Sequence, residues 1–277
     1  MRIGRFLWKG EERVGLVKEQ HVIPLAGDGG CADWALAGAG GAPQGEPQPL
    51  SSVRLLAPIR RGRVFCVGYN YLDHVTETAH DLPSDPVTFL RTTASIVGPQ
   101  DQLWRPRASR CFDFEGELAA VIGRPGRHIA PADALEHVFG FTCFMDGSVR
   151  DFQKHAVSAG KTFERTAAMG PWIVSRDEAP DWDTTTVTTR LNDRIVQESP
   201  TGLMVFGLPD LIAYFSTITT LLPGDVVATG TPSGVGSRRN PPLWMQPGDR
   251  IEVTVDRVGV LANEVVEEPD VPARARA

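Results

Sequence analysis

Two acidic residues inside an apolar, strand-like run constrain the fold of this chain most. Glu115 and Glu117 occupy positions i and i+2 of the run Phe-Glu-Gly-Glu-Leu at 114–118. On an extended strand both side chains leave the same face, and Gly116 between them adds no bulk. Residues 138–145 predict a second buried strand that ends on Asp146. If the two strands are neighbours, three carboxylates converge on one point.

Three converging carboxylates need a compensating charge. Buried together they repel one another too strongly to stay ionised without a metal ion or a proton. A ligand set made only of oxygen atoms favours Mg²⁺, Mn²⁺ or Ca²⁺ over zinc. The same spacing also fits an ordinary half-buried strand whose acidic side chains face solvent, with Asp146 opening a turn. Spacing alone does not decide between a metal site and a solvated strand.

Composition excludes several classes of protein. A chain of 277 residues with 42% hydrophobic content can bury a substantial core. The net charge is −6 and there is no tract dense in lysine or arginine, so we expect no nucleic-acid binding. No apolar run approaches the length of a membrane span, and the start lacks the pattern of a signal peptide, so we expect a cytoplasmic protein that does not bind membranes. The four cysteines form no C-x-x-C pair, which argues against a zinc knuckle.

The pattern of short strands and frequent turns predicts an α+β fold dominated by β-sheet. We expect a small β-rich region and linker at 1–52, a main domain at 53–268 and a flexible tail at 269–277. Within the main domain the predicted elements are strands at 64–68, 225–229 and 250–255, a hairpin that turns at 192–193, and a helix over 208–216.

A histidine and a glutamate lie on a predicted short helix directly after the strand at 64–68. His74 and Glu77 are i, i+3 neighbours on that helix. A carboxylate one turn away can orient an imidazole and stabilise its protonated form, which makes His74 a candidate general base. Taken alone, the pair fits a solvated helix face better than a catalytic site. Its place after a buried strand, where active-site loops commonly lie, favours the catalytic interpretation.

Further polar residues follow the second acidic strand. Arg150 and Gln153 share one face of a short predicted helix, and Lys161 comes soon after. Near a metal, these side chains suit an anionic, oxygen-rich substrate, although Arg150 also fits a solvated surface. The glycine-rich loop at 228–236 lacks the G-K-[S/T] of a phosphate-binding loop, but its N–H groups and the Thr231 hydroxyl can contact a carboxylate. No serine-hydrolase, zinc-protease or dinucleotide-binding motif occurs.

In their order along the chain, these segments resemble the fumarylacetoacetate hydrolase family. The resemblance covers about residues 53–265 and rests on the segments 67–71, 74–77, 114–118, 146, 150–153, 160–161 and 229–236. It implies a mixed β-roll catalytic domain of the fumarylacetoacetate hydrolase C-terminal type with a small N-terminal β-rich domain. It also implies assembly as a homodimer and a bound Mg²⁺ ion, with Mn²⁺ or Ca²⁺ as alternatives.

The resemblance also assigns roles to individual residues. The metal ligands are Glu115, Glu117 and Asp146. The catalytic residues are His74 and Glu77, which lie on a mobile lid, and Lys161, which lies beside the metal. The residues expected to bind substrate are Tyr69, Arg150, Gln153 and Thr231.

The reaction that this implies is hydrolysis of a C–C bond in a 2-oxo or 1,3-dicarbonyl acid, such as an acylpyruvate, through a metal-stabilised enolate. His74 activates the attacking water. The same chemistry supports decarboxylation or isomerisation of an oxaloacetate-like or unsaturated 2-oxo diacid, and fold similarity does not separate these reactions. A catalytically silent metabolite-binding protein is the alternative from another class. It predicts the loss of a metal ligand or of the dyad, and none is missing.

Two positions depart from the family pattern. Arg91 stands where many members carry a lysine, and Gly-Ser-Val at 147–149 replaces the usual Val-Ser/Thr-Ala. We expect neither position to touch the metal ligands and both to influence the choice of substrate.

Overall fold

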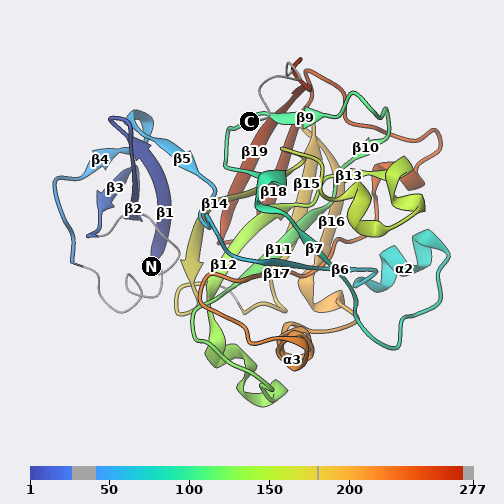
Figure 1. Ribbon diagram of the computed structural model, residues 1–277, viewed down its shortest axis with the longest axis horizontal. Helices are drawn as coiled ribbons and strands as arrows, with labels where there is room; N and C mark the ends of the chain where they lie inside the picture. Colours follow the sequence, from blue (N-terminus) through green and yellow to red (C-terminus); the bar gives the residue numbers. More distant parts are fainter. Residues whose placement is uncertain (27–41, 180, 271–277) are drawn as a thin grey trace, which may run out of the picture.

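Two β-rich parts of unequal size make up the fold (Figure 1). The computed structural model describes residues 1–26, 42–179 and 181–270. The strands at 2–56 form the smaller part, at the left of Figure 1, and the remaining strands form the larger part together with the α-helices that the structure describes. Among the described residues, no helix is both long enough and apolar enough to cross a membrane.

In the described part of the chain, the largest sheet has twelve strands and runs through both parts. Its main path is β4-β3-β2-β1-β14-β12-β11-β17-β6-β7, with β5 paired to β1 and β8 paired to β14. The bounds are β1 (Arg2–Trp8), β2 (Glu11–Lys18), β3 (His21–Pro24), β4 (Gln48–Pro49), β5 (Arg54–Leu56), β6 (Val64–Gly68), β7 (Val87–Arg91), β8 (Ile96–Val97), β11 (Gly116–Ile122), β12 (Val138–Met145), β14 (Ala167–Ser175) and β17 (Val226–Ala228).

A five-stranded sheet, in the order β16-β15-β18-β19-β9, lies against the large one, and two short strands pair separately. These strands are β9 (Leu103–Arg105), β15 (Thr186–Leu191), β16 (Arg194–Pro200), β18 (Arg250–Val255) and β19 (Gly259–Glu267), with β10 (Phe112–Asp113) and β13 (Ser148–Val149) as the separate pair. The α-helices described are α2 (Leu72–Thr78) and α3 (Leu208–Ile218). The 3₁₀ segments are η1 (Leu50–Ser52), η2 (Thr93–Ser95), η3 (Pro131–His137), η4 (Arg150–Lys154), η5 (Val157–Gly160), η6 (Thr201–Leu203) and η7 (Gly236–Arg238).

The main hydrophobic core lies between the two sheets. Leu118 on β11 joins Val187 on β15 and Val253 on β18 in this core. The alternate residues Ala119 and Val121 leave the other face of β11 and belong to a second buried cluster. Both faces of β11 are therefore buried, which explains its nearly continuous apolar sequence. Glu117 shares its face with the second cluster, because side chains alternate along a strand.

The fold expected from the sequence is confirmed: strands dominate, and the sheets are mixed, with parallel pairing of β17 to β6 among antiparallel neighbours. The predicted strands at 64–68, 138–145 and 250–255 have the observed bounds. The hairpin turns at Asn192 and Asp193, whose φ angles of 49° and 66° suit a tight turn between twisted strands.

The expected division of the chain at residue 52 stays a prediction. The segment just after it, β5, pairs with β1, and β1 pairs with β14, so hydrogen bonds connect both parts. Of the tail predicted to be flexible, Asp270 is described and forms an ion pair with Arg107. Residues 271–277 and most of the predicted linker, 27–41, lie outside the described residues.

Candidate active site

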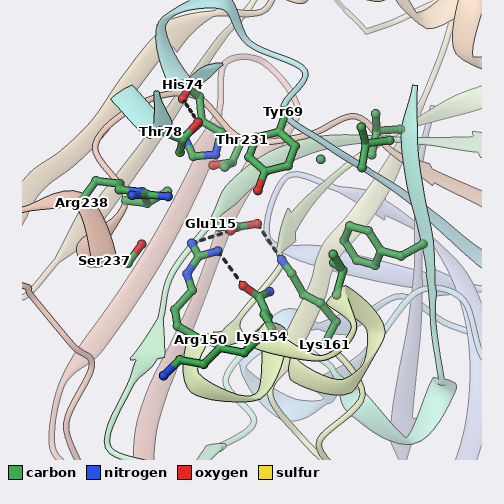
Figure 2. Close-up of a pocket in the computed structure, with 17 residues that line it drawn as sticks. Tyr69, His74, Thr78, Glu115, Arg150, Lys154, Lys161, Thr231, Ser237 and Arg238 are labelled. Carbon is green, nitrogen blue, oxygen red and sulfur yellow. Dashed lines mark hydrogen bonds and ion pairs between the residues drawn. The ribbon is translucent and has the colours of Figure 1, made fainter. Parts of the chain in front are cut away.

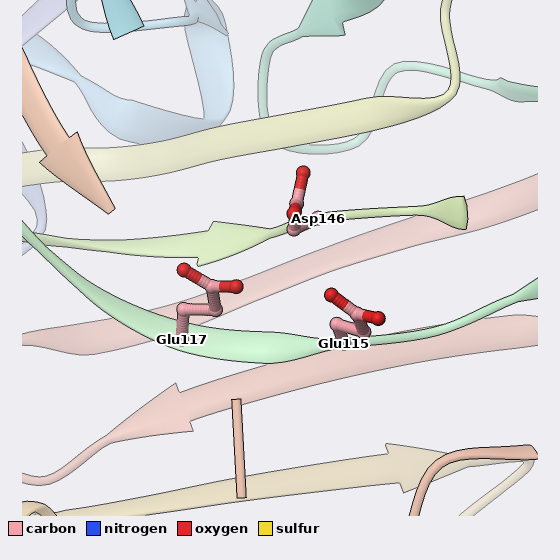
Figure 3. Close-up of side chains that lie close together, drawn as sticks. All are labelled: Glu115, Glu117 and Asp146. Carbon is pink, nitrogen blue, oxygen red and sulfur yellow. The ribbon is translucent and has the colours of Figure 1, made fainter. Parts of the chain in front are cut away.

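The three carboxylates meet because β11 and β12 are antiparallel neighbours. Gly116 pairs with Met145, so Glu115 and Asp146 lie side by side just beyond the paired ends of these strands. The Asp146 N–H donates to the Glu115 carbonyl at 2.8 Å. One carboxylate oxygen from each of Glu115, Glu117 and Asp146 lies within 4.8 Å of the others, and all three residues are buried (Figure 3).

Close packing at Gly116 brings this strand against the second sheet. A Cβ atom built on Gly116 would lie 2.0 Å from Thr189 Oγ1. Gln197 on β16 holds the same residue: its Oε1 accepts the Gly116 N–H at 3.0 Å, and its Nε2 donates to Thr231 Oγ1 at 2.8 Å. Thr231 in turn donates to the Gly116 carbonyl at 3.0 Å. The backbone between the two glutamates is therefore fixed on both sides.

Cationic side chains surround two of the three carboxylates. Lys161 Nζ lies 2.6 Å from Glu115 Oε2 and also contacts an oxygen of Asp146. Arg150 Nη2 lies 2.6 Å from the other oxygen of Glu115. Burial raises the pKa of Glu115, but Lys161 and Arg150 outweigh burial and hold this pKa at about 2. Glu115 is therefore ionised throughout the physiological pH range.

Glu117 has a different environment. Within the described part of the chain, its carboxylate accepts a hydrogen bond from the Gly230 N–H, at 2.9 Å from Oε2. Burial, followed by the charges of Asp146 and Glu115, raises the pKa of Glu117 well above its ordinary value. Without an added cation, burial and the two neighbouring carboxylates favour the protonated form of Glu117 more than in an ordinary glutamate. A divalent cation held by the three carboxylates would favour the ionised form instead, and the oxygen donors suit Mg²⁺, Mn²⁺ or Ca²⁺.

We expected that neither departure from the family pattern would touch the metal ligands, and for Arg91 this expectation is wrong. Its buried guanidinium contacts Asp146 through Nη1, and the same nitrogen donates to the Gly147 carbonyl at 3.0 Å. Ser148 donates to the Asp146 carbonyl at 3.2 Å. The expectation was wrong because β7 lies remote in sequence from Asp146, and the tertiary fold alone places Arg91 beside it.

The His74 and Glu77 pair forms on α2 as its spacing predicted. His74 Nδ1 lies 3.1 Å from Glu77 Oε2. The other oxygen of Glu77 accepts the Gly234 N–H at 2.9 Å. Asp73 also joins α2 to this loop, since its Oδ2 accepts the Ser233 hydroxyl at 2.6 Å. The helix that was expected to be a mobile lid is therefore docked on the glycine-rich loop in this structure.

A cavity of about 370 Å³ opens beside these groups (Figure 2). Seven of the predicted site residues line it, while Glu77, Glu117 and Asp146 do not. The seven are Tyr69, His74, Glu115, Arg150, Gln153, Lys161 and Thr231. The Tyr69 ring stacks on His74, with centroids 6.1 Å apart, and its φ of 54° turns the chain sharply after β6. The cavity thus brings His74 of the dyad, the basic residues and one carboxylate of the cluster to a common space.

Asp113 links the substrate-binding candidates to the glycine-rich loop. Its carboxylate accepts Arg150 Nε at 2.7 Å and the N–H groups of Gly236 and Ser237 at 2.7 and 3.0 Å. Gln153 accepts Arg150 Nη1 at 3.2 Å. Arg150 is therefore held from three directions and is not the solvated surface residue that its sequence context also allowed.

Sequence reasoning missed several residues of the site. Asp113 stands next to the acidic run and could have been included on that ground. Arg91 was noted only as a departure from the family pattern that influences the choice of substrate. Gln197 sits in an ordinary strand sequence, and Lys154 and Arg238 at the cavity have no motif that distinguishes them. Arg91 and Gln197 reach the site only because the fold brings together segments far apart in the chain.

Comparisons with known proteins agree with this architecture. The family model described as fumarylacetoacetate (FAA) hydrolase C-terminal matches residues 63–266, and the model described as Rv2993c-like, N-terminal matches residues 1–58. The human mitochondrial oxaloacetate tautomerase FAHD2A is 42% identical over 223 residues, which cover 79% of this chain and 71% of that protein.

Two solved structures are similar along nearly the whole chain. A 5-carboxymethyl-2-hydroxymuconate delta-isomerase from Mycobacterium smegmatis has a TM-score of 0.84 and 33% identity, covering 97% of this chain and 100% of that one. A maleylpyruvate hydrolase from Sphingobium sp. SYK-6, in complex with manganese(II) and pyruvate, has a TM-score of 0.80 and 28% identity, covering 97% and 100%. Because the family model spans most of the sequence, the chain belongs to the fumarylacetoacetate hydrolase family.

Proposed function

We propose that this protein is an enzyme that transfers a proton to or from a 2-oxo carboxylic acid in the cavity beside Glu115. The observation that carries the proposal is that the cavity is lined by a histidine with a bound carboxylate, His74, and by the cation of Lys161. A base and a positive charge facing one space are the requirements for removing a proton next to a keto group.

His74 is the group that moves the proton. With Glu77 accepting from Nδ1, the hydrogen of the neutral imidazole lies on Nδ1, and Nε2 is left to take up a proton. Glu77 then stabilises the imidazolium that forms. Because Gly234 also donates to Glu77, the carboxylate holds the imidazole in one orientation while α2 is docked.

Lys161 and Arg150 stabilise the negative charge that develops when the proton leaves. Lys161 is buried and its amine is held between Glu115 and Asp146. Removal of one such well-placed charge or donor costs an enzyme roughly 10²–10³-fold in rate. Glu115, Glu117 and Asp146 would hold a divalent ion, for which we propose Mg²⁺, and that ion supplies Lewis acidity toward the oxygen atoms of a 2-oxo acid.

Among the reactions that begin this way, we propose keto–enol tautomerisation or isomerisation of a 2-oxo acid first. Support comes from the relative that is named as an oxaloacetate tautomerase, at 42% identity, and from the similar structure named as an isomerase. Hydrolysis of a C–C bond is the second candidate. It uses the same dyad to activate water, and the similar maleylpyruvate hydrolase favours it. The catalytically silent alternative requires the loss of a metal ligand or of the dyad, and all of these residues are present. The homodimer stays a prediction.

The test is a substrate panel on purified, Mg²⁺-loaded protein. We would follow the loss of enol absorbance for oxaloacetate, acid release from acylpyruvates, and CO₂ release from both. Tautomerase activity predicts enol loss without acid or CO₂ release, and hydrolase activity predicts equal amounts of two acid products. His74→Ala should reduce whichever activity is present by at least roughly 10²-fold. Full activity in His74→Ala would refute the proposed role of the dyad.

A further inference from the structure

Asp113 is a buried carboxylate to which the proposed mechanism gives no part. It lies on β10, two residues before Glu115, and its side chain is fully buried. It does not line the cavity, and it does not belong to the cluster of Glu115, Glu117 and Asp146. Burial of a carboxylate costs free energy unless hydrogen bonds and a cation compensate it, so the partners of Asp113 indicate its role.

Both oxygen atoms of Asp113 act as hydrogen-bond acceptors. Oδ1 accepts the N–H groups of Phe114 and Gly236, at 2.8 and 2.7 Å. Oδ2 accepts Arg150 Nε and the Ser237 N–H, at 2.7 and 3.0 Å. An asparagine side chain has a single acceptor oxygen, so in either orientation its NH₂ group would face two of these donors. The position therefore requires a carboxylate.

The carboxylate of Asp113 is held in a fixed position. Its backbone belongs to the β10–β13 pair, in which Asp113 stands opposite Ser148. Gly236 packs so closely that an added Cβ atom would lie 2.6 Å from Asp113 Oδ1 and 1.9 Å from the Leu243 carbonyl oxygen. A cation that binds this carboxylate is therefore held in place as well.

Arg150 is shared between two carboxylates. Its Nε donates to Asp113, while its Nη2 lies 2.6 Å from Glu115 Oε1. On the other oxygen of Glu115, Lys161 Nζ lies at 2.6 Å, so that Glu115 stands between the two cations (Figure 2). Glu115 thus contacts one cation that it shares with Asp113 and a second that it shares with Asp146.

A divalent ion at Glu115 has to compete with both of these cations. The attraction of Arg150 to Asp113 weakens its hold on Glu115, because one guanidinium charge interacts with two carboxylates. Without Asp113, the guanidinium would keep Glu115 as its remaining carboxylate partner among the described residues. A metal that broke this contact would then leave a largely buried cation unpaired, which is costly. Asp113 therefore favours metal binding at Glu115.

We propose that Asp113 is a positioning residue that acts through Arg150. By binding the Nε end of the guanidinium, Asp113 weakens the contact of Arg150 with Glu115 and so favours a divalent ion at Glu115. The inference rests on the divalent ion of the proposed function, and it adds a residue that adjusts how tightly that ion is bound. It does not depend on which substrate the cavity takes.

The experiment measures Mg²⁺ binding by calorimetry on the purified full chain, after removal of metal with EDTA and in the absence of substrate. The proteins are native, Asp113→Asn, Arg150→Met and the double variant. Asp113→Asn should raise the Kd for Mg²⁺ by about tenfold, and Arg150→Met should lower it by about tenfold. Because Asp113 acts through Arg150, the double variant should bind Mg²⁺ within about twofold of Arg150→Met. An unchanged Kd in Asp113→Asn, or an equal rise in Kd with and without Arg150, would overturn the proposal.

A matched control separates this role from a general loss of stability. Asp225 is also buried, and its carboxylate accepts Arg63 Nε at 3.0 Å and the Leu222 N–H at 2.8 Å, outside the cavity. Asp225→Asn should lower Tm but leave the Kd for Mg²⁺ within about twofold of native. A rise in Kd as large as that of Asp113→Asn would overturn the proposal.

Arg150→Met decides the question alone if Asp113→Asn does not fold. It leaves Asp113 with three N–H donors, so we expect this variant to remain folded. A Kd for Mg²⁺ below the native value then supports the proposal, and a Kd equal to or above it overturns the proposal.

The two proposals fail in distinguishable ways. If native protein turns over no 2-oxo acid but the Mg²⁺ affinities change as expected, the proposed function is wrong and the role of Asp113 stands. If native protein turns over a 2-oxo acid but Asp113→Asn and Arg150→Met bind Mg²⁺ as native protein does, the role of Asp113 is wrong and the proposed function stands.

Discussion

Two isosteric substitutions in the carboxylate cluster should change stability in opposite directions. Glu115→Gln and Glu117→Gln each remove one negative charge and keep the shape of the side chain. Glu115 contacts the cations of Lys161 and Arg150, whereas Glu117 accepts one backbone hydrogen bond and faces two other carboxylates. In metal-free protein we therefore expect Glu115→Gln to destabilise the fold and Glu117→Gln to stabilise it.

The size of the first effect follows from the pKa of Glu115. This pKa is about 2 in the folded protein, compared with about 4.3 for an unperturbed glutamate. A lowered pKa contributes stability above the unfolded value, and this contribution is lost as the pH falls toward 2. The difference corresponds to about 3 kcal/mol at pH 7, so Glu115→Gln should lower Tm by roughly 6–10 °C.

The sign is reversed for Glu117, whose pKa is raised by burial and by its two acidic neighbours. A carboxyl group with a raised pKa costs stability as the pH rises from its unfolded value toward its folded value. Native metal-free protein should therefore lose stability with rising pH above about 4.3 relative to Glu117→Gln. The advantage of Glu117→Gln should be larger at pH 8 than at pH 5.

The assay is thermal unfolding of the native protein and both variants at pH 5 and pH 8, after dialysis against EDTA and again with Mg²⁺. Native protein should gain Tm on addition of Mg²⁺, because the ion binds the folded state, and both variants should gain less. If Glu117→Gln unfolds at a lower temperature than native metal-free protein at pH 8, the repulsion assigned to this cluster is refuted. Equal destabilisation by both variants would refute it as well.

Three more predictions test the support around the site. Replacing the buried Arg91 by Leu removes the guanidinium that contacts Asp146 and should lower the free energy of unfolding by about 3–5 kcal/mol. Arg91→Lys keeps the positive charge and should lower it by less. Urea denaturation measures both variants, and equal losses would contradict the ion pair. The added methyl group of Gly116→Ala should clash with Thr189 Oγ1 and lower the free energy of unfolding by roughly 1–3 kcal/mol. Adding Thr189→Ala to the same chain should restore part of the lost Tm. If it restores none, the strain lies elsewhere. Asp73→Ala should release α2 from Ser233, speed amide hydrogen exchange in α2 and lower kcat/KM by about tenfold. Thr76→Ala, on the exposed face of the same helix, should change neither the exchange nor kcat/KM. Unchanged exchange in Asp73→Ala would show that the contact with Ser233 does not hold the helix.

Local sequence determined the elements and the residue types of the site. Alternation of side chains along a strand is a local property, so the spacing of Glu115 and Glu117 predicted their common face. Helical periodicity is equally local, and it predicted the contact of His74 with Glu77. The strand at 64–68 and the turn at 192–193 follow from apolar runs and turn residues in the same way.

Only the tertiary structure decided how the charges are balanced. Arg91 on β7 reaches Asp146 beyond the end of β12, and Gln197 on β16 reaches Gly116 across two sheets. These contacts depend on which strands become neighbours, and strand order is set by packing of the whole core instead of by any short segment. For the same reason, the sequence indicated that three carboxylates converge, while the fold determined that Glu115 is paired with cations and Glu117 is not.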